Sequence, residues 1–306
     1  MMETSSKEAG EPVDMILDKS AAQVLYDGML TDPQLDHPEG VAVHRDGSVW
    51  CGGERGQIYR ISADGSSMAQ VTSTGGYCLG MAFDKEDNLY VCDLKHQAVI
   101  RDDTKSDSTG DSTDKFATDA DGRSLRIPNF PVFDDAGRLY VSDSHAFKEP
   151  GPGIFRFDPD GKGELWYAEP LNFANGLALS PDGRYLYVSE TFGNTVSRIS
   201  IEDDGSAGTR EEVASLPGVL PDGLAFDVDG NLYIACYEPS QVLRVAPDWA
   251  VARLVGDEEA HLFCHPTNLA FRNGTLFTTN LGRCHITSVQ TMAEGLPLYG
   301  GYRGEH

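Results

Sequence analysis

Four oxygen-bearing residues occupy matching places in the sequence: Glu39, Asn129, Asn175 and Asp222. Each stands at the entry of an apolar stretch that leads into a turn and a second apolar stretch. Carboxylate and amide oxygens are hard ligands of the kind that Ca²⁺ prefers, and two carboxylates balance the charge of one divalent ion. The set contains no Cys or His, which argues against an ordinary zinc or copper site. The pattern predicts a calcium-type site if the fold brings the four together.

A purely structural explanation exists for each of these residues. Asp and Asn are common at strand entries because their side chains bond the local backbone and form turns. For one residue alone this explanation is the better one, but four residues in register, one of them Glu39, favour the metal. The equivalent positions of two further segments are Leu79 and Thr267, which depart from the pattern. An off-axis ion held from four positions out of six would account for both.

The elements that would position these residues recur along the chain. The segment "PDGLAFDVDGNLYIAC" from Pro221 has counterparts in "PEGVAVHRDGSVWCGG" from Pro38 and "ANGLALSPDGRYLYVSE" from Ala174, and three more copies begin at Cys78, Pro128 and Pro266. Each copy has the pattern of a β-hairpin, and two more strand candidates follow it. A repeat of roughly 40 to 50 residues predicts an all-β, six-bladed β-propeller with four antiparallel strands per blade. Its innermost strands would line a channel, where the four side chains converge.

The last repeat has only three strand candidates. We expect the missing outer strand at 23–30, so that a strand near the N-terminus closes the last blade and removes the open edge. The predicted organisation is a disordered tail over 1–16 and a single propeller domain over 17–306.

Composition excludes several classes of protein. A formal net charge of −24 argues against binding to nucleic acid and to anionic membrane surfaces. The sequence has no apolar run of about 18 residues that could span a membrane, and its first residues do not have the pattern of a secretory signal. The six cysteines form no CxxC pair, so we interpret them as reduced core residues of a cytoplasmic protein.

The repeats resemble a known family. The segments "HPEGVAV", "RIPNFPVFDDAGRLYVSDS" and "LPDGLAFDVDGNLYIA" are similar to those of the SMP-30/gluconolactonase/LRE family of six-bladed propellers. That family is related to the squid-type diisopropyl fluorophosphatase and, more distantly, to paraoxonase. The resemblance extends from about Val24 to Val289. It implies that one catalytic divalent ion is bound by Glu39, Asn129, Asn175 and Asp222, with Ca²⁺ expected first and Mg²⁺, Mn²⁺ or Zn²⁺ as alternatives.

The resemblance also implies an activity, that of a metal-dependent hydrolase that opens a sugar lactone or another small lactone. The ion would polarise the ester carbonyl, and Asp222 would be a ligand and also the nucleophile or the group that activates water. Strictosidine synthase relatives are similar in fold but lack the four ligands, which argues against that branch. The alternatives are a phosphotriesterase-type hydrolase and a non-hydrolytic propeller, either a calcium-stabilised binding scaffold or a biosynthetic isomerase or cyclase.

Further site candidates follow the second strand of each repeat or flank the first. Asp143 is a candidate general base, with a turn-capping role as the equal alternative. His145 and His265 are candidates for acid or base, because histidine titrates near neutral pH, although a structural role is common for any single histidine. The expected substrate contacts are Tyr77, Phe130, Phe173, Glu190, Tyr237 and Asn268, and the alternative for the aromatic ones is that they plug the channel.

Overall fold

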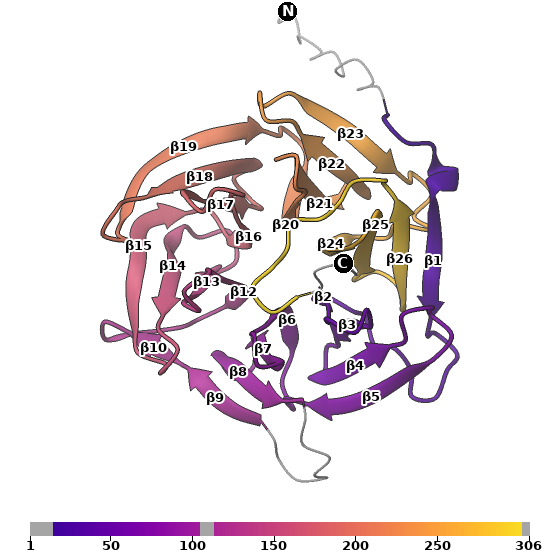
Figure 1. Cartoon of the computed structure of the whole chain (residues 1–306), viewed down its shortest axis with the longest axis horizontal. Coiled ribbons are helices and arrows are strands. Elements are labelled where there is room, and N and C mark those ends of the chain that lie inside the picture. The colour runs from indigo at the N-terminus through magenta and orange to yellow at the C-terminus, as the bar shows by residue number, and fades with distance from the viewer. Residues whose placement is uncertain (1–14, 105–112, 302–306) are drawn as a thin grey trace, which may run out of the picture.

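The computed structural model describes residues 15–104 and 113–301. In this part of the chain, six four-stranded antiparallel sheets surround a central axis as the blades of a β-propeller (Figure 1). This confirms the predicted all-β, six-bladed architecture. The described residues contain a single short helix, the 3-10 turn η1 (Lys19–Ala21). None of the described helices has the length and apolar character needed to cross a membrane.

In blades 1 to 5 the strands follow one another in sequence order from the axis outward. Blades 1 and 2 consist of β2 (Val41–Val43), β3 (Val49–Gly52), β4 (Gln57–Ile61), β5 (Met68–Ser73), β6 (Cys78–Phe83), β7 (Asn88–Asp93), β8 (Ala98–Asp103) and β9 (Thr113–Ala117). Blades 3 and 4 consist of β12 (Pro128–Phe133), β13 (Leu139–Asp143), β14 (Gly151–Phe157), β15 (Gly163–Leu171), β16 (Ala174–Leu179), β17 (Tyr185–Glu190), β18 (Thr195–Ile201) and β19 (Ala207–Ser215). Blades 5 and 6 consist of β20 (Leu220–Phe226), β21 (Leu232–Glu238), β22 (Gln241–Val245), β23 (Val251–Gly256), β24 (Pro266–Arg272), β25 (Thr275–Asn280), β26 (His285–Gln290) and β1 (Ala22–Asp27). A small hairpin of β10 (Asp119–Ala120) and β11 (Arg123–Ser124) links blades 2 and 3.

The first hairpin of every blade turns through a residue with positive φ. Glycine supplies it in four blades, for example Gly183 (φ 68°) and Gly230 (φ 82°), while Asp87 (φ 69°) and Asn273 (φ 52°) supply it in the other two. Glycine enters this region without steric cost, and Asp and Asn tolerate it better than other residues. The turn residues that marked the repeats in the sequence therefore set the position of each hairpin.

The ring is closed by the strand predicted near the N-terminus. β1 pairs antiparallel with β26, with Gln23 opposite Ser288 and Val24 opposite Thr287. Upstream of β1, Ile16 donates a backbone hydrogen bond to Arg253 of blade 5 at 2.9 Å. The expected disordered tail concerns mostly residues 1–14, which lie outside the described residues, and the described residues 15 and 16 run beside β23.

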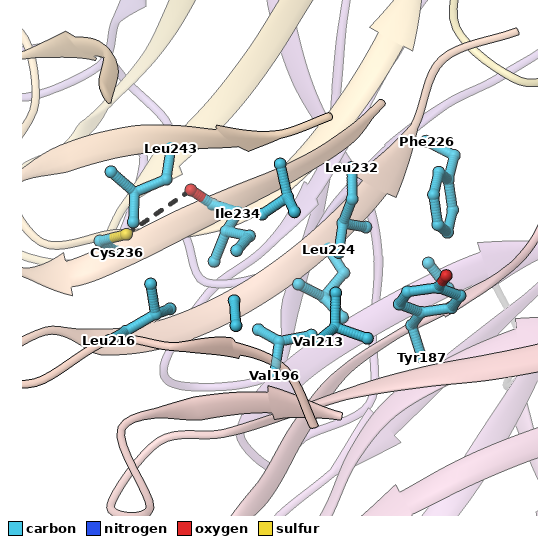
Figure 2. Packing of buried hydrophobic residues seen from close by; sticks show 13 residues of the cluster. Tyr187, Val196, Val213, Leu216, Leu224, Phe226, Leu232, Ile234, Cys236 and Leu243 are labelled. Atoms are coloured by element: carbon cyan, nitrogen blue, oxygen red, sulfur yellow. Dashed lines mark hydrogen bonds between the residues drawn. The ribbon is translucent and has the colours of Figure 1, made fainter. Parts of the chain in front are cut away.

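The core consists of hydrophobic clusters between neighbouring blades. Figure 2 shows the cluster between blades 4 and 5, in which Val196 and Val213 face Leu224 and Ile234. Successive residues of one strand enter different clusters: Val41 packs toward blade 6, and Ala42 packs toward blade 2. Because both faces of the inner part of each sheet are buried, strands such as β7 and β13 are buried along almost their whole length, and no blade could bury its surface alone.

The segment after β26 crosses the axis at one end of the channel (Figure 1). The backbone N–H of Leu296 bonds Phe226 of blade 5, and the ring of Tyr299 stacks on Phe133 of blade 3 at 5.4 Å between centroids. Together with the far ends of the innermost strands, this segment lines a cavity of about 490 Å³. The segment therefore covers the end of the channel at which the innermost strands finish.

Candidate metal centre

The four predicted ligands lie at the opposite end of the channel, where the innermost strands begin. Asn129, Asn175 and Asp222 are early residues of β12, β16 and β20, and Glu39 precedes β2 by two residues. All four side chains belong to buried residues, none exposed by more than 5%. We call Glu39, Asn129, Asn175 and Asp222 the axial ring.

Hydroxyl groups fix the backbone of the axial ring from the neighbouring blade. Ser142 of β13 donates to the carbonyl oxygen of Asn175 at 2.6 Å, and Ser189 of β17 donates to that of Asp222. Thr279 of β25 donates to the carbonyl oxygen of Glu39 at 2.6 Å across the closure of the ring. Each ring residue except Asn129 is thus held in position by the blade before it.

Glycines let the innermost strands approach one another at this level. A Cβ atom on Gly176 would lie 2.4 Å from the carbonyl oxygen of Asp222, and one on Gly40 would lie 2.2 Å from that of Leu79. Real side chains do not tolerate such contacts with backbone atoms. The glycine that follows Glu39, Asn175 and Asp222 in the sequence is therefore required for the ring residues to converge.

The two ring amides have a defined orientation. Asn175 Nδ2 donates to Thr191 Oγ1 at 3.1 Å, and Thr191 Oγ1 donates its only proton to the carbonyl oxygen of Pro221 at 2.8 Å. Because that proton is committed, the hydroxyl must accept from the amide nitrogen. Asn175 Oδ1 is left without a hydrogen-bond partner. Asn129 repeats the arrangement through Ser144, and its Oδ1 is also unpaired.

The two ring carboxylates are buried in each other's field. Burial raises the pKa of Glu39 to about 7, against hydrogen bonds from Thr267 and Asn268 that lower it. Burial and then the charge of Glu39 raise the pKa of Asp222 well above its usual value. Asp222 Oδ1 has no hydrogen-bond partner either. Two buried carboxylates and unpaired amide oxygens fit a hard divalent cation, which would compensate both the charge and the missing hydrogen bonds.

The equivalent positions of the other two blades, Leu79 and Thr267, hold no carboxylate or amide. Leu79 belongs to the hydrophobic cluster between blades 2 and 3. Thr267 uses its hydroxyl to donate to the carbonyl oxygen of Glu39 at 2.7 Å. The departures at these two positions in the sequence therefore have structural explanations.

Asp143 lies away from the axis and binds backbone. Its carboxylate accepts the N–H groups of Arg126 (2.6 Å), Ile127 (2.9 Å) and His145 (2.7 Å). These contacts favour the turn-capping alternative, because the carboxylate oxygens are already engaged. Glu190 has a similar place in blade 4, where it accepts the N–H of Asn172 at 2.8 Å and pairs with Arg210.

The two candidate histidines differ in the state of their rings. Arg126 Nη1 donates to His145 Nε2 at 3.0 Å, so the lone pair of that nitrogen is occupied. His265 Nδ1 lies 3.0 Å from the carbonyl oxygen of Tyr237, and a carbonyl only accepts, so Nδ1 carries the proton and Nε2 is the basic position. The ring of His265 also stacks on that of Tyr237 at 4.4 Å. Of the two, the geometry of His265 suits a base.

Aromatic side chains occupy the mouth on the axial-ring side. Burial and the charge of Glu39 raise the pKa of Tyr77, and burial with nearby charges, including that of Asp222, raises that of Tyr237. Both tyrosines therefore lie within the field of the ring carboxylates. Phe173 packs with Phe147 and Phe192, at 6.3 and 4.9 Å between centroids. Phe130 instead lines the cavity at the other end of the channel.

One further group of possible metal ligands lies near the mouth in the described part of the chain. Asp36, His37 and Glu54 place their ligand atoms within 4.8 Å of one another. His37 Nδ1 is 3.4 Å from Asp36 Oδ1 and 3.6 Å from Glu54 Oε2. These separations are those of an ion-paired triad when the histidine is protonated.

The hydroxyl residues that orient the ring were not predicted from the sequence. Ser142 and Ser144 in "VSDS", and Ser189 and Thr191 in "VSET", are fully or almost fully buried. Two hydroxyl residues flanking an acidic one at the end of a strand are the signal that could have identified them. Only the acidic residue of each group was considered, and it proved to bond backbone outside the ring.

Comparison with known proteins places the chain in a family. The family model described as the SMP-30/Gluconolactonase/LRE-like region matches residues 37–281. The chain belongs to this family. Among its relatives, the lactonase drp35 of Staphylococcus haemolyticus is 27% identical over 288 residues, which cover 75% of this chain and 88% of that protein.

Two other proteins that are similar to this chain have different described functions. The Arabidopsis thaliana protein strictosidine synthase-like 6 is 28% identical over 254 residues, 74% of this chain and 66% of that protein, so this chain spans about two thirds of the plant relative. A calcium-binding protein, regucalcin of Agrobacterium tumefaciens, superposes with a TM-score of 0.69 at 17% identity, over 87% of this chain and 96% of that one. At this identity the superposition supports the fold alone.

Proposed function

We propose that this protein is a divalent-cation-dependent lactonase whose ion, Ca²⁺ in the first place, is held by the axial ring. The observation that carries the proposal is the set of unpaired oxygens on Asn129, Asn175 and Asp222, which are buried together with the carboxylate of Glu39. The lactonase among its relatives supports the substrate class, a sugar lactone or another small lactone. Four protein oxygens at one site favour Ca²⁺ over Mg²⁺, which usually keeps several waters, and the absence of Cys and His argues against Zn²⁺; Mn²⁺ is the alternative among oxygen-binding ions.

The side chains around the ring suit ester hydrolysis. When bound, the ion would supply a Lewis acid for the ester carbonyl. Asp222 presents an unpaired oxygen from the ring, and this oxygen is placed to attack the carbonyl or to accept a proton from water. His265 Nε2 is a second position that can take a proton. Tyr77 and Tyr237 lie within the field of the ring carboxylates and are the aromatic side chains best placed to contact a substrate there.

The plant relatives favour one competing function, a non-hydrolytic propeller that uses the same pocket for a biosynthetic reaction. The axial ring argues for a bound ion, since the unpaired oxygens of Asn129, Asn175 and Asp222 have no other partner, and a bound ion would supply the Lewis acid that ester hydrolysis needs. A phosphotriesterase-type activity would use the same ring, because a Lewis acid also polarises a phosphoryl oxygen. The free thiols of the six cysteines support our proposal of a reducing, cytoplasmic location.

The test is hydrolysis of a lactone panel, comprising gluconolactone, a γ-butyrolactone, dihydrocoumarin and one aryl phosphotriester. Each is assayed before and after EDTA and with Ca²⁺, Mg²⁺, Mn²⁺ and Zn²⁺ restored separately. We expect EDTA to abolish turnover of at least one lactone and Ca²⁺ to restore it. Absence of turnover with every ion, despite a metal-dependent rise in melting temperature, would contradict the hydrolase and favour the non-hydrolytic alternative.

A further inference from the structure

Asn268 of β24 is a polar side chain at the axis with an unexplained oxygen. The residue is fully buried, and its Oδ1 has no hydrogen-bond partner. Its Nδ2 lies 3.4 Å from Glu39 Oε2, so the amide reaches a member of the axial ring. A buried amide oxygen without a partner costs free energy, about 1 to 3 kcal/mol in typical proteins. A ligand bound to Oδ1 would offset this cost.

The position of Asn268 in its blade is unusual. It directly follows the ring-level residue Thr267, and the equivalent position in four other blades is a glycine, as at Gly40 and Gly223. A Cβ atom on Gly223 would lie 2.8 Å from the Cα of Asn268, so this level of the channel is crowded. The fifth equivalent, Phe130, is apolar and lines the cavity beyond the ring. Blade 6 alone among the six places an amide there.

A role limited to holding Glu39 does not account for the whole side chain. The contact with Glu39 uses only Nδ2. Oδ1 is left in the same state as the amide oxygens of Asn129 and Asn175, buried and unpaired. In those two residues a hydroxyl binds the nitrogen and the oxygen is left for the ion. Asn268 differs because a ring carboxylate takes the place of the hydroxyl.

We propose that Asn268 Oδ1 is a fifth protein ligand of the ion in the axial ring, contributed by the sixth blade. This inference rests on the proposed metal site. Oδ1 and Nδ2 are bonded to the same carbon, so the amide that contacts Glu39 Oε2 through Nδ2 holds its unpaired oxygen beside the same carboxylate.

Five protein oxygens restrict the choice of ion. Ca²⁺ accepts six to eight ligands and keeps open positions for water and substrate, whereas octahedral Mg²⁺ would keep one. A fifth ligand from blade 6 therefore favours Ca²⁺. It also leaves the coordination positions for water and substrate on the side of the ion that faces away from β24.

The experiment counts the water molecules on the bound ion. Tb³⁺ serves as a luminescent substitute for Ca²⁺, and its decay rates in H₂O and D₂O give the number of coordinated waters. We expect Asn268→Ala to add one water and to weaken Ca²⁺ affinity, measured by calorimetry, by about 10- to 100-fold. Asn268→Asp retains an oxygen, so it should keep the wild-type water count and bind Ca²⁺ more tightly.

Asn172→Ala is the matched control, because Asn172 Oδ1 is also unpaired but belongs to the loop before β16. It should leave the water count and the affinity unchanged. An Asn268→Ala protein with weaker affinity but the wild-type water count would overturn the proposal and reduce Asn268 to a positioning residue for Glu39. Failure of the wild-type protein to bind Tb³⁺ or Ca²⁺ would instead refute the metal site itself. The far-ultraviolet circular dichroism of each variant verifies that it folds.

Discussion

At the scale of single residues, the axial ring depends on hydroxyl groups that never touch the ion. Thr191 accepts from the amide of Asn175 and donates to Pro221 in the next blade, so one hydroxyl both aims a ligand and joins two blades. Ser144 does the same for Asn129. Such partners are known to tune metal sites nearly as strongly as the ligands themselves.

Replacement of Thr191 tests whether its hydroxyl orients the amide of Asn175. Thr191→Val keeps the shape but removes the acceptor, so the Asn175 amide is free to turn and to present Nδ2 to the ion. We expect Ca²⁺ affinity to fall about 10- to 100-fold and unfolding free energy to fall by about 1 to 3 kcal/mol. Thr195→Val is the control, since Thr195 is buried in the same blade but bonds only Ala214. Equal Ca²⁺ affinities in both variants would show that Thr191 does not orient the Asn175 amide.

The buried carboxylates predict an unusual pH dependence for the metal-free protein. Burial raises the pKa of Glu39 from 4.5 to about 7. The stability associated with its protonated form is fully present below about pH 4.5 and is lost as the pH rises through about 7. In EDTA, the melting temperature should therefore be higher at pH 5.5 than at pH 8, and Ca²⁺ should restore it at pH 8.

The variant Glu39→Gln isolates this effect. It removes one titrating carboxyl and also the charge that raises the pKa of Asp222. Melting curves in EDTA between pH 5 and 8.5 should show a smaller dependence on pH for the variant than for the wild type. An identical dependence in both proteins would assign the effect to other groups.

The axial ring could be predicted from sequence because the repeat places equivalent residues at one height. The hydroxyl groups that orient the ring and the role of Asn268 could not be predicted, because they depend on which side chains meet across a blade boundary. Ser142 and Asn175 are 33 residues apart and belong to different repeats. Asp143 illustrates the opposite error, because a carboxylate after a strand resembles a catalytic group until the N–H groups of Arg126 and Ile127 are seen to occupy it.

At the scale of the elements, Asp143 and its equivalents in blades 2, 4 and 6 hold the loop that precedes the innermost strand. The two N–H groups that Asp143 accepts from that loop lie only two and three residues before Asn129. Asp93 serves blade 2 in the same way, accepting the N–H of Tyr77 at 3.2 Å. Asn280 serves blade 6, accepting the N–H of Cys264 at 2.9 Å. Glu190 holds the loop before Asn175 through the N–H of Asn172, so the loops before the two ring amides, Asn129 and Asn175, are both anchored.

Replacement of Asp143 distinguishes its two candidate roles, which are to hold the loop before Asn129 and to act as a general base. Asp143→Ala leaves backbone N–H groups without their acceptor, and we expect unfolding free energy to fall by roughly 2 to 4 kcal/mol. Ca²⁺ affinity should fall as well, because Asn129 loses its support. Urea denaturation and calorimetry provide the two measurements. A variant of wild-type stability and Ca²⁺ affinity that has lost lactone turnover would restore Asp143 as a general base.

At the scale of the whole molecule, stability depends on the contact between β1 and β26. All six blades pack on two neighbours, so opening the ring at this point exposes the edge of β26 and weakens the packing on both sides. The pair Gln23 and Ser288 is directly opposed in this contact. Opposed residues of antiparallel strands have Cα atoms about 4.5 to 5.5 Å apart, within the range of a disulfide.

A covalent closure should therefore stabilise the propeller. The double variant Gln23→Cys/Ser288→Cys closes a very long loop, for which the chain-entropy model gives a stabilisation of up to about 5 kcal/mol. We expect its melting temperature to exceed that of the wild type by several degrees when oxidised and to return to it when a reductant is added. Gln23→Cys alone is the control and should not respond to the reductant. No difference between oxidised and reduced forms of the double variant would show that opening of β1 does not limit stability.

The same closure has a consequence for the protein while it is being made. Among the strands of the described residues, β1 leaves the ribosome first and β26, with which it pairs, leaves last. At translation rates of about 5 to 20 residues per second, β1 waits roughly 10 to 50 s for its partner. During that time the nascent chain can pack five blades but cannot complete the ring. The open strand edges therefore stay unpaired until β26 has been made.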